Sequence, residues 1–207
     1  MFWKKKKKEQ APAQTRRGLN DTPFDESCKA IMSLGARGAY GYFKTITNYA
    51  NERGIKHNSM KLVAAGAMLY DFVLREVITN EMKNNGNGNF VAEFTQDMAA
   101  VQMHEVIARC TADHVNVKYD EDTFVGVASI FNMMGQLTGD AHKAMYSLLN
   151  EIFTAASQDD LAMIVDITKG CVTAMTEFYE GLVKGVRVTR EGKDVVLHFI
   201  DNPHLKF

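Results

Sequence analysis

The sequence is poor in proline, cysteine and tryptophan, with three, three and one of these residues among 207. Three scattered cysteines (Cys28, Cys110 and Cys171) cannot form a disulfide framework, and we therefore expect a reducing compartment, the cytoplasm. No apolar run approaches the ~18 residues that a membrane-spanning helix needs, so the sequence predicts no integral membrane protein. Apolar residues make up 46% and charged residues 24%, a composition typical of a folded globular protein.

Positive charge is concentrated at the N-terminus. Residues 1–20 contain seven basic residues and one acidic residue, which gives this segment a charge of +6. Subtracting them from the totals of 24 basic and 25 acidic residues leaves 17 basic and 24 acidic residues in 21–207, a charge of −7. Nucleic acid binding requires Lys and Arg gathered on one surface. We therefore expect the acidic body to repel polyanions, and any such contact to involve the N-terminal segment.

Residues 1–22 are predicted to form a flexible, disordered basic tail. No apolar run follows the lysines, so the segment does not fit a secretory signal. Two aromatic rings beside five lysines suit an anchor at an anionic membrane surface, where each lysine contributes roughly 1 kcal/mol. A solvated terminus that aids solubility and a nucleic-acid or nuclear-import patch are the alternatives. The candidate membrane- or polyanion-binding residues are Phe2, Trp3, Lys4, Lys5, Lys6, Lys7, Lys8, Arg16 and Arg17.

Helical periodicity dominates residues 23–184 and predicts an all-α bundle of six helices. Ser59, Asp120 and Ser157 are the expected N-cap residues of the second, fourth and sixth helices. Gly35, Gly38 and Gly41 recur every three residues, which indicates a bare ridge where another backbone approaches, and the small residues 64–67 are its expected partner. The expected helices span 24–52, 59–84, 90–112, 120–137, 140–156 and 157–184.

The period changes to alternation after Gly185, and residues 185–207 are predicted to form a β-hairpin with a C-terminal segment packed on the bundle. Val195, Leu197 and Phe199 share one face of the second strand, and the candidate partner-binding residues Val196, His198 and Ile200 share the other. Exposed apolar residues beside a strand edge favour a protein partner or a homodimer. The alternative is that residues 204–207 fold back over them.

Twelve methionines are many for a chain of this length. Flexible thioethers suit surfaces that repack around partners, although gap-filling in an irregular core is the favoured interpretation. The neighbours Met133 and Met134 differ by ~100° around a helix, so one of them is expected to face outward and to bind a partner.

Motifs of known catalytic chemistry are missing, and we expect no catalytic residue, metal or cofactor. Cys110 and His114 lie four residues apart beside Asp113, which makes half of a zinc site whose completion needs distant ligands such as Cys171 or His142. Asp97, His104 and Glu105 make a poor acid–base group, since His104 lies two turns after Asp97. A site assembled across helices would escape motif searching.

The predicted function is that of a non-enzymatic helical adaptor or scaffold that binds other proteins. The tail would hold it at the cytoplasmic face of the membrane as a peripheral protein, within a secretion or envelope-associated assembly. A nucleic-acid-associated helical protein that uses its basic tail is one alternative, and an enzyme with an unrecognised site is another.

Overall fold

The structure, a computed structural model, describes residues 24–138, 141–192 and 194–198. The predicted N-terminal tail therefore lies outside the described residues. The mostly all-α fold with a small C-terminal hairpin is confirmed. The elements are α1 (Asp25–Glu52), α2 (Ser59–Asn84), the 3₁₀ helix η2 (Gly88–Phe90), α3 (Val91–Ala100), α4 (Met103–His114), α5 (Glu121–Thr138), α6 (Ala141–Ile152), α7 (Gln158–Val183), β1 (Arg187–Glu191) and β2 (Asp194–His198).

The described residues contain seven α-helices rather than six, because the helix predicted over 90–112 is two helices. The backbone of Gln102 is left-handed, with φ 52° and ψ 54°, and α3 and α4 meet at this residue. Each of the two helices buries its own apolar residues, with Phe94 and Met98 in α3 and Met103 and Ile107 in α4. The apolar spacing alone did not reveal the change of direction between them.

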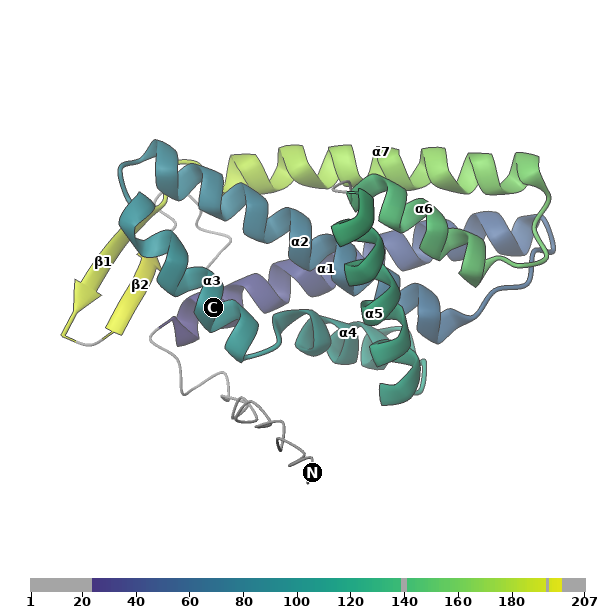
Figure 1. Ribbon diagram of the computed structural model, residues 1–207, viewed down its shortest axis with the longest axis horizontal. Coiled ribbons are helices and arrows are strands. Elements are labelled where there is room, and N and C mark those ends of the chain that lie inside the picture. The colour runs from purple at the N-terminus through teal and green to yellow at the C-terminus, as the bar shows by residue number, and fades with distance from the viewer. Residues whose placement is uncertain (1–23, 139–140, 193, 199–207) are drawn as a thin grey trace, which may run out of the picture.

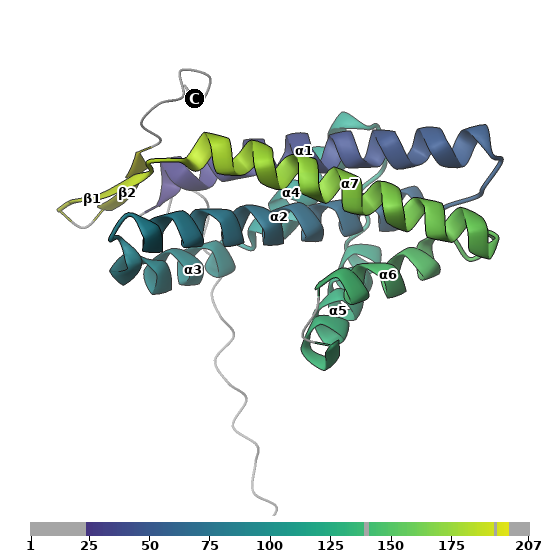
Figure 2. The same cartoon turned by 90° about the horizontal axis from the view of Figure 1, so that it is seen from above.

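Helix α2 is the central element. Every residue from Leu62 to Asp71 is buried, as expected for a helix that has neighbours on all sides. It contacts α1, α4, α5 and α7. Figures 1 and 2 show α1, α2 and α7 as long helices running beside one another, while α5 and α6 form a pair that stands out on one side of them.

Glycines of α1 allow the close approach of neighbouring side chains, whereas the predicted ridge implied the close approach of another backbone. A Cβ atom on Gly35 would lie 2.4 Å from the Ile107 side chain of α4, and one on Gly38 would lie 2.6 Å from Tyr70 and from Tyr179. The small patch of α2 does face α1, since a Cβ on Gly66 would meet Tyr42 at 3.1 Å. A Cβ atom on Gly41 would meet nothing within 4 Å, so Gly41 takes no part in this close packing.

The hairpin docks on α1 and α3. Antiparallel pairing joins Val188 to Leu197 and Arg190 to Val195. Val195 and Leu197 are buried on the same face, as the alternation predicted. The Leu197 amide donates to the Ser27 Oγ of α1 at 3.1 Å, and Arg190 pairs with Glu93 of α3 at 2.7 Å. Figure 1 places the hairpin at the end of the molecule where α1 begins and α7 ends.

Two of the three predicted helix caps are confirmed. The Asp120 carboxylate accepts from the amide of Thr123, and the Ser157 hydroxyl accepts from the amide of Asp160. The N-cap of α2 is Asn58 rather than Ser59, because the Asn58 side chain accepts from the Lys61 amide at 2.9 Å. Either residue type can supply this acceptor, so the sequence left the position ambiguous by one residue.

Candidate functional site

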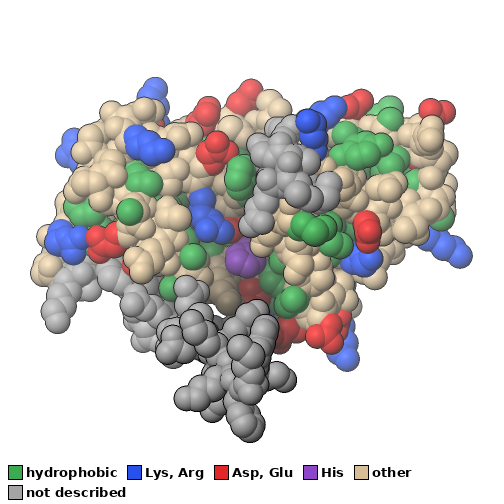
Figure 3. Space-filling model, in the orientation of Figure 1, with side chains coloured by type: hydrophobic (Ala, Val, Ile, Leu, Met, Phe, Trp, Pro, Cys, Tyr) green, Lys and Arg blue, Asp and Glu red, His purple; other side chains and the backbone are tan. Residues whose placement is uncertain are grey.

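Large exposed apolar side chains occur on the pair α5 and α6 and on α7. Met133 of α5 is 53% exposed, and Val125, Tyr146, Met163 and Phe178 are similarly open to solvent. Figure 3 shows hydrophobic side chains gathered over α6, the adjoining part of α7 and α5 on one face of the molecule. Single exposed apolar residues are ordinary on protein surfaces, so their position relative to a groove decides their meaning.

A groove of about 360 Å³ lies between α5, α6 and the start of α2. Its floor is apolar, with Val127 and Leu148 buried and Ile130 half-buried. Lys61 and Glu151 form an ion pair of 3.8 Å between α2 and α6 at its border. The lining residues are Lys61, Asp122, Thr123, Gly126, Val127, Ile130, Leu148 and Glu151.

Met133 extends the apolar surface of this groove along α5. Gly126, Ile130 and Met133 follow one another at spacings of four and three residues, which places them on one side of the helix. A Cβ atom on Gly126 would meet nothing within 4 Å, so the surface is open above this residue. We call these three residues the α5 stripe. An open apolar stripe beside a polar border is the kind of surface on which an amphipathic helix docks.

A buried charged cluster lies beneath α4 and α5. Asp71 of α2 is 2% exposed and accepts a hydrogen bond from Arg75, one turn along the same helix. The Nδ1 atom of His104 in α4 lies 3.8 Å from Asp71 Oδ2. The His104 ring stacks on Phe124 of α5, with ring centroids 5.7 Å apart.

The environment of this cluster changes the pKa values of two groups in opposite directions. Burial raises the pKa of the Asp71 carboxyl, and the neighbouring Arg75 partly offsets this. Burial lowers the pKa of His104, and the Asp71 carboxylate partly offsets that effect. Sequence reasoning compared His104 with Asp97 and Glu105 and missed Asp71. No local spacing connects residues 33 positions apart on different helices.

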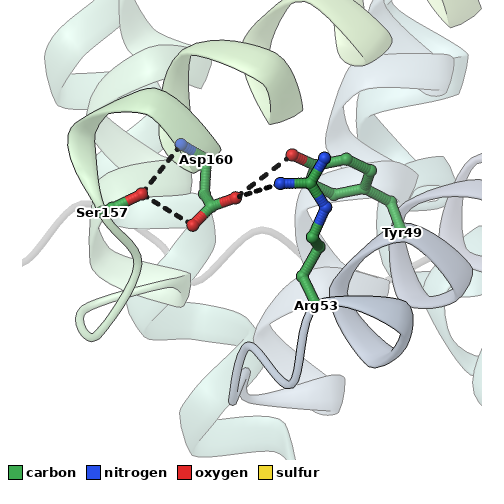
Figure 4. A network of polar contacts seen from close by, with 4 residues as sticks. All are labelled: Tyr49, Arg53, Ser157 and Asp160. Carbon is green, nitrogen blue, oxygen red and sulfur yellow. Dashed lines mark hydrogen bonds and ion pairs between the residues drawn. The ribbon is translucent and has the colours of Figure 1, made fainter.

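A second polar network joins the end of α1 to the start of α7 (Figure 4). The Asp160 carboxylate accepts from the Ser157 hydroxyl at 2.6 Å and from the Tyr49 hydroxyl at 3.2 Å, and it pairs with Arg53 at 3.5 Å. The hydrogen bond from Ser157 is the main reason that the pKa of Asp160 is lowered. The network connects the start of α7 to the end of α1.

Two other grooves differ from the first in charge and lining. One of about 550 Å³ lies between the ends of α2 and α7 and contains Glu81, Glu177 and Glu180. The other, of about 330 Å³ between α1 and α4, contains Cys110 and His114, the pair noted for zinc. Burial raises the pKa of the Cys110 thiol, which disfavours a thiolate ligand or nucleophile. Among the described residues, no three potential metal-ligating side chains gather in one place.

The structure describes only some of the predicted partner-binding residues. Met133 is exposed, as expected for one of the two methionines, while the side chain of Met134 and the whole of Ile200 lie outside the described residues. Phe2, Trp3, the five lysines, Arg16 and Arg17 lie outside them as well.

On the hairpin, His198 is exposed and its Nε2 lies 2.6 Å from the Thr189 hydroxyl, whereas Val196 is half-buried. Arg187 and Thr189 pair with His198 and Val196 on this face. The described part of this face is therefore mainly polar, and it offers less exposed apolar surface than the alternation of apolar residues predicted.

No described helix has both the length and the apolar character required to span a membrane. Comparison with known proteins gave no match to a protein family, to a curated protein or to a solved structure.

Proposed function

We propose that this chain is a non-enzymatic helical adaptor or scaffold that binds another protein in the groove between α5 and α6. The α5 stripe is the observation that supports the proposal most directly. It combines an open glycine, a half-buried isoleucine and an exposed methionine beside a groove with a buried apolar floor. Met133 can adapt its side chain to the surface of a partner.

The charges around the grooves favour a protein partner over nucleic acid for the helical body. Among the described residues that line the three grooves, each groove contains a single Lys or Arg, namely Lys61, Lys184 or Arg37. Phosphate recognition needs several Lys or Arg side chains on one surface. This distribution agrees with the net charge of −7 over residues 21–207.

The N-terminal residues support a second part of the proposal, a peripheral location at the cytoplasmic face of the membrane. Phe2 and Trp3 precede five consecutive lysines. Aromatic rings insert at the headgroup boundary while lysines attract anionic lipid, and the combination gives reversible attachment.

The groove is tested with Gly126→Leu, which places a side chain in the open part of the groove. The matched control is Gly170→Leu in α7, because Gly170 is also exposed, helical and free of neighbours within 4 Å of a Cβ. Proteins captured from a lysate of the source cells are identified for the wild-type chain and for both variants, after thermal melts have shown that both variants fold. We expect Gly126→Leu to lose captured proteins that Gly170→Leu retains. Identical captured sets for the three chains would contradict a role for the groove.

The location is tested by co-sedimentation of the full chain with vesicles of phosphatidylglycerol and phosphatidylcholine over a salt series, with duplex DNA binding measured in parallel. We expect lipid binding that weakens in Phe2→Ala/Trp3→Ala. Stronger binding to the duplex than to the vesicles, unaffected by the aromatic substitutions, would support the nucleic-acid alternative instead.

A further inference from the structure

Two buried polar atoms in the Asp71 cluster have no hydrogen-bond partner among the described residues. They are Oδ1 of Asp71 and Nδ1 of His104. The distance of 3.8 Å between His104 Nδ1 and Asp71 Oδ2 is slightly too long for a hydrogen bond. Buried polar groups are nearly always satisfied, so such a pair marks a place where a small movement or a change of protonation has a large effect.

The charges that surround His104 come from two helices. Asp71 and Arg75 face it from α2, and Glu105 is its neighbour on α4, where Glu105 accepts two hydrogen bonds from Arg109. From α5, Phe124 contributes an uncharged ring. While His104 is neutral, the charges of Asp71 and Arg75 compensate each other. A protonated His104 would add a second cation beside the Asp71 carboxylate, while the Glu105 carboxylate already accepts from Arg109, in a site where the imidazole is largely removed from water.

We propose that His104 is an acid-sensitive contact between α2, α4 and α5. In its neutral form it packs between Asp71 and Phe124 and holds the start of α4 and the start of α5 against α2. Its protonation weakens this junction. Phe124 and the α5 stripe belong to the same helix, but the inference does not depend on partner binding.

The sign of the pH effect follows from the direction of the pKa change. The pKa of His104 in the folded chain is below its ordinary value of 6.5, so the folded chain holds fewer protons at this site than the unfolded chain. The contribution of His104 to stability is therefore complete above pH 6.5 and is lost as the pH falls through the folded pKa. Asp71, whose pKa is raised, has the opposite effect on stability at lower pH. The contribution of His104 is therefore separated from that of Asp71 by substituting His104.

The first measurement is the urea midpoint of the full chain and of His104→Gln between pH 7.5 and pH 5. We expect the stability of the wild-type chain to fall relative to His104→Gln as the pH decreases. His198→Gln, on the exposed face of the hairpin, is the matched control for the loss of an imidazole. Amide exchange corrected for intrinsic rates should show the loss of protection at the starts of α4 and α5. A stability difference between the wild-type chain and His104→Gln that does not vary with pH would overturn the proposal.

The second measurement reads the protonation of His104 directly, and its wild-type arm requires no variant; the Asp71→Asn arm is read after a thermal melt has shown that this variant folds. The His104 ring is titrated by NMR in the wild-type chain, and we expect a midpoint below 6.5. In Asp71→Asn the midpoint should fall further, because the carboxylate that favours the imidazolium has been removed. A wild-type midpoint at or above 6.5 would overturn the proposal. So would a midpoint that Asp71→Asn leaves unchanged.

Discussion

The hydroxyl of Tyr179 in α7 donates a hydrogen bond to the backbone carbonyl oxygen of Leu34 in α1 at a distance of 3.0 Å. Both tyrosines near this point, Tyr70 and Tyr179, are fully buried. The contact requires the absence of a side chain at Gly38, since a Cβ there would lie 2.6 Å from Tyr179 Oη and from Tyr70 Cδ1. One glycine therefore allows three helices to meet around two aromatic rings.

The first prediction concerns this close approach. Gly38→Ala should destabilise the chain by about 1–3 kcal/mol, because the added methyl group displaces buried rings that have little room to move. Gly41→Ala is the matched control on the same helix, one turn further on, where a Cβ would meet nothing within 4 Å. It should be neutral or stabilise by up to about 1 kcal/mol through helix propensity. Urea unfolding of both variants makes the comparison, and equal effects would show that the packing around Gly38 is looser than described.

The second prediction separates two buried hydroxyls. Tyr179→Phe removes the hydrogen bond to Leu34 and should cost about 0.5–1.5 kcal/mol. The Tyr70 hydroxyl is buried with no hydrogen-bond partner among the described residues. Tyr70→Phe should therefore be neutral or slightly stabilising, because it removes an unsatisfied polar group and keeps the ring. Thermal or urea melts decide the order, and a larger loss in Tyr70→Phe than in Tyr179→Phe would contradict this description of the core.

Much of the helical fold could be predicted from local patterns. The apolar spacing located the long helices α1, α2 and α7 to within a few residues of their ends. Cap residues such as Asp120 and Ser157 could be predicted because their side-chain oxygen accepts a hydrogen bond from an amide three residues away, which is a local interaction. The hairpin was equally visible, since its alternation and its turn lie within a dozen residues.

The features that escaped prediction depend on contacts between distant segments. Asp71 and His104 are neighbours because α4 packs on α2, and no pattern within either helix encodes their distance. Gly38 was recognised as a site of close approach, but its partners are Tyr70 and Tyr179 rather than a backbone. The groove combines residues from α2, α5 and α6, none of which the sequence suggested as partner-binding, whereas Met133, which it did suggest, lies further along α5.

The third prediction tests the junction between α3 and α4. Gln102 adopts the left-handed region with φ 52°, which is unfavourable for a residue with a side chain and favourable for glycine. Gln102→Gly should stabilise the chain by about 0.5–1 kcal/mol, because relief of this strain exceeds the added freedom of the unfolded chain. Ala99→Gly, within α3 and exposed, should instead cost about 1 kcal/mol. The same loss in both variants would mean that residues 99 and 102 share a helical conformation.

The fourth prediction is a pH dependence at the network of Figure 4. Hydrogen bonds from Ser157 and Tyr49 hold the pKa of Asp160 below its ordinary value of 3.8. The folded chain therefore binds fewer protons than the unfolded chain at this site, and the stabilisation is present above pH 3.8 and lost as the pH falls through the folded pKa. Urea midpoints measured from pH 6 to pH 2 should show a smaller acid loss in Asp160→Asn than in the wild-type chain. Asp166→Asn, also on α7 and paired with Lys169 on the same helix, is the matched control for the loss of an exposed carboxylate. If Asp160→Asn keeps the full acid loss, the carboxylate does not anchor α7 to α1 in the way that its distances indicate.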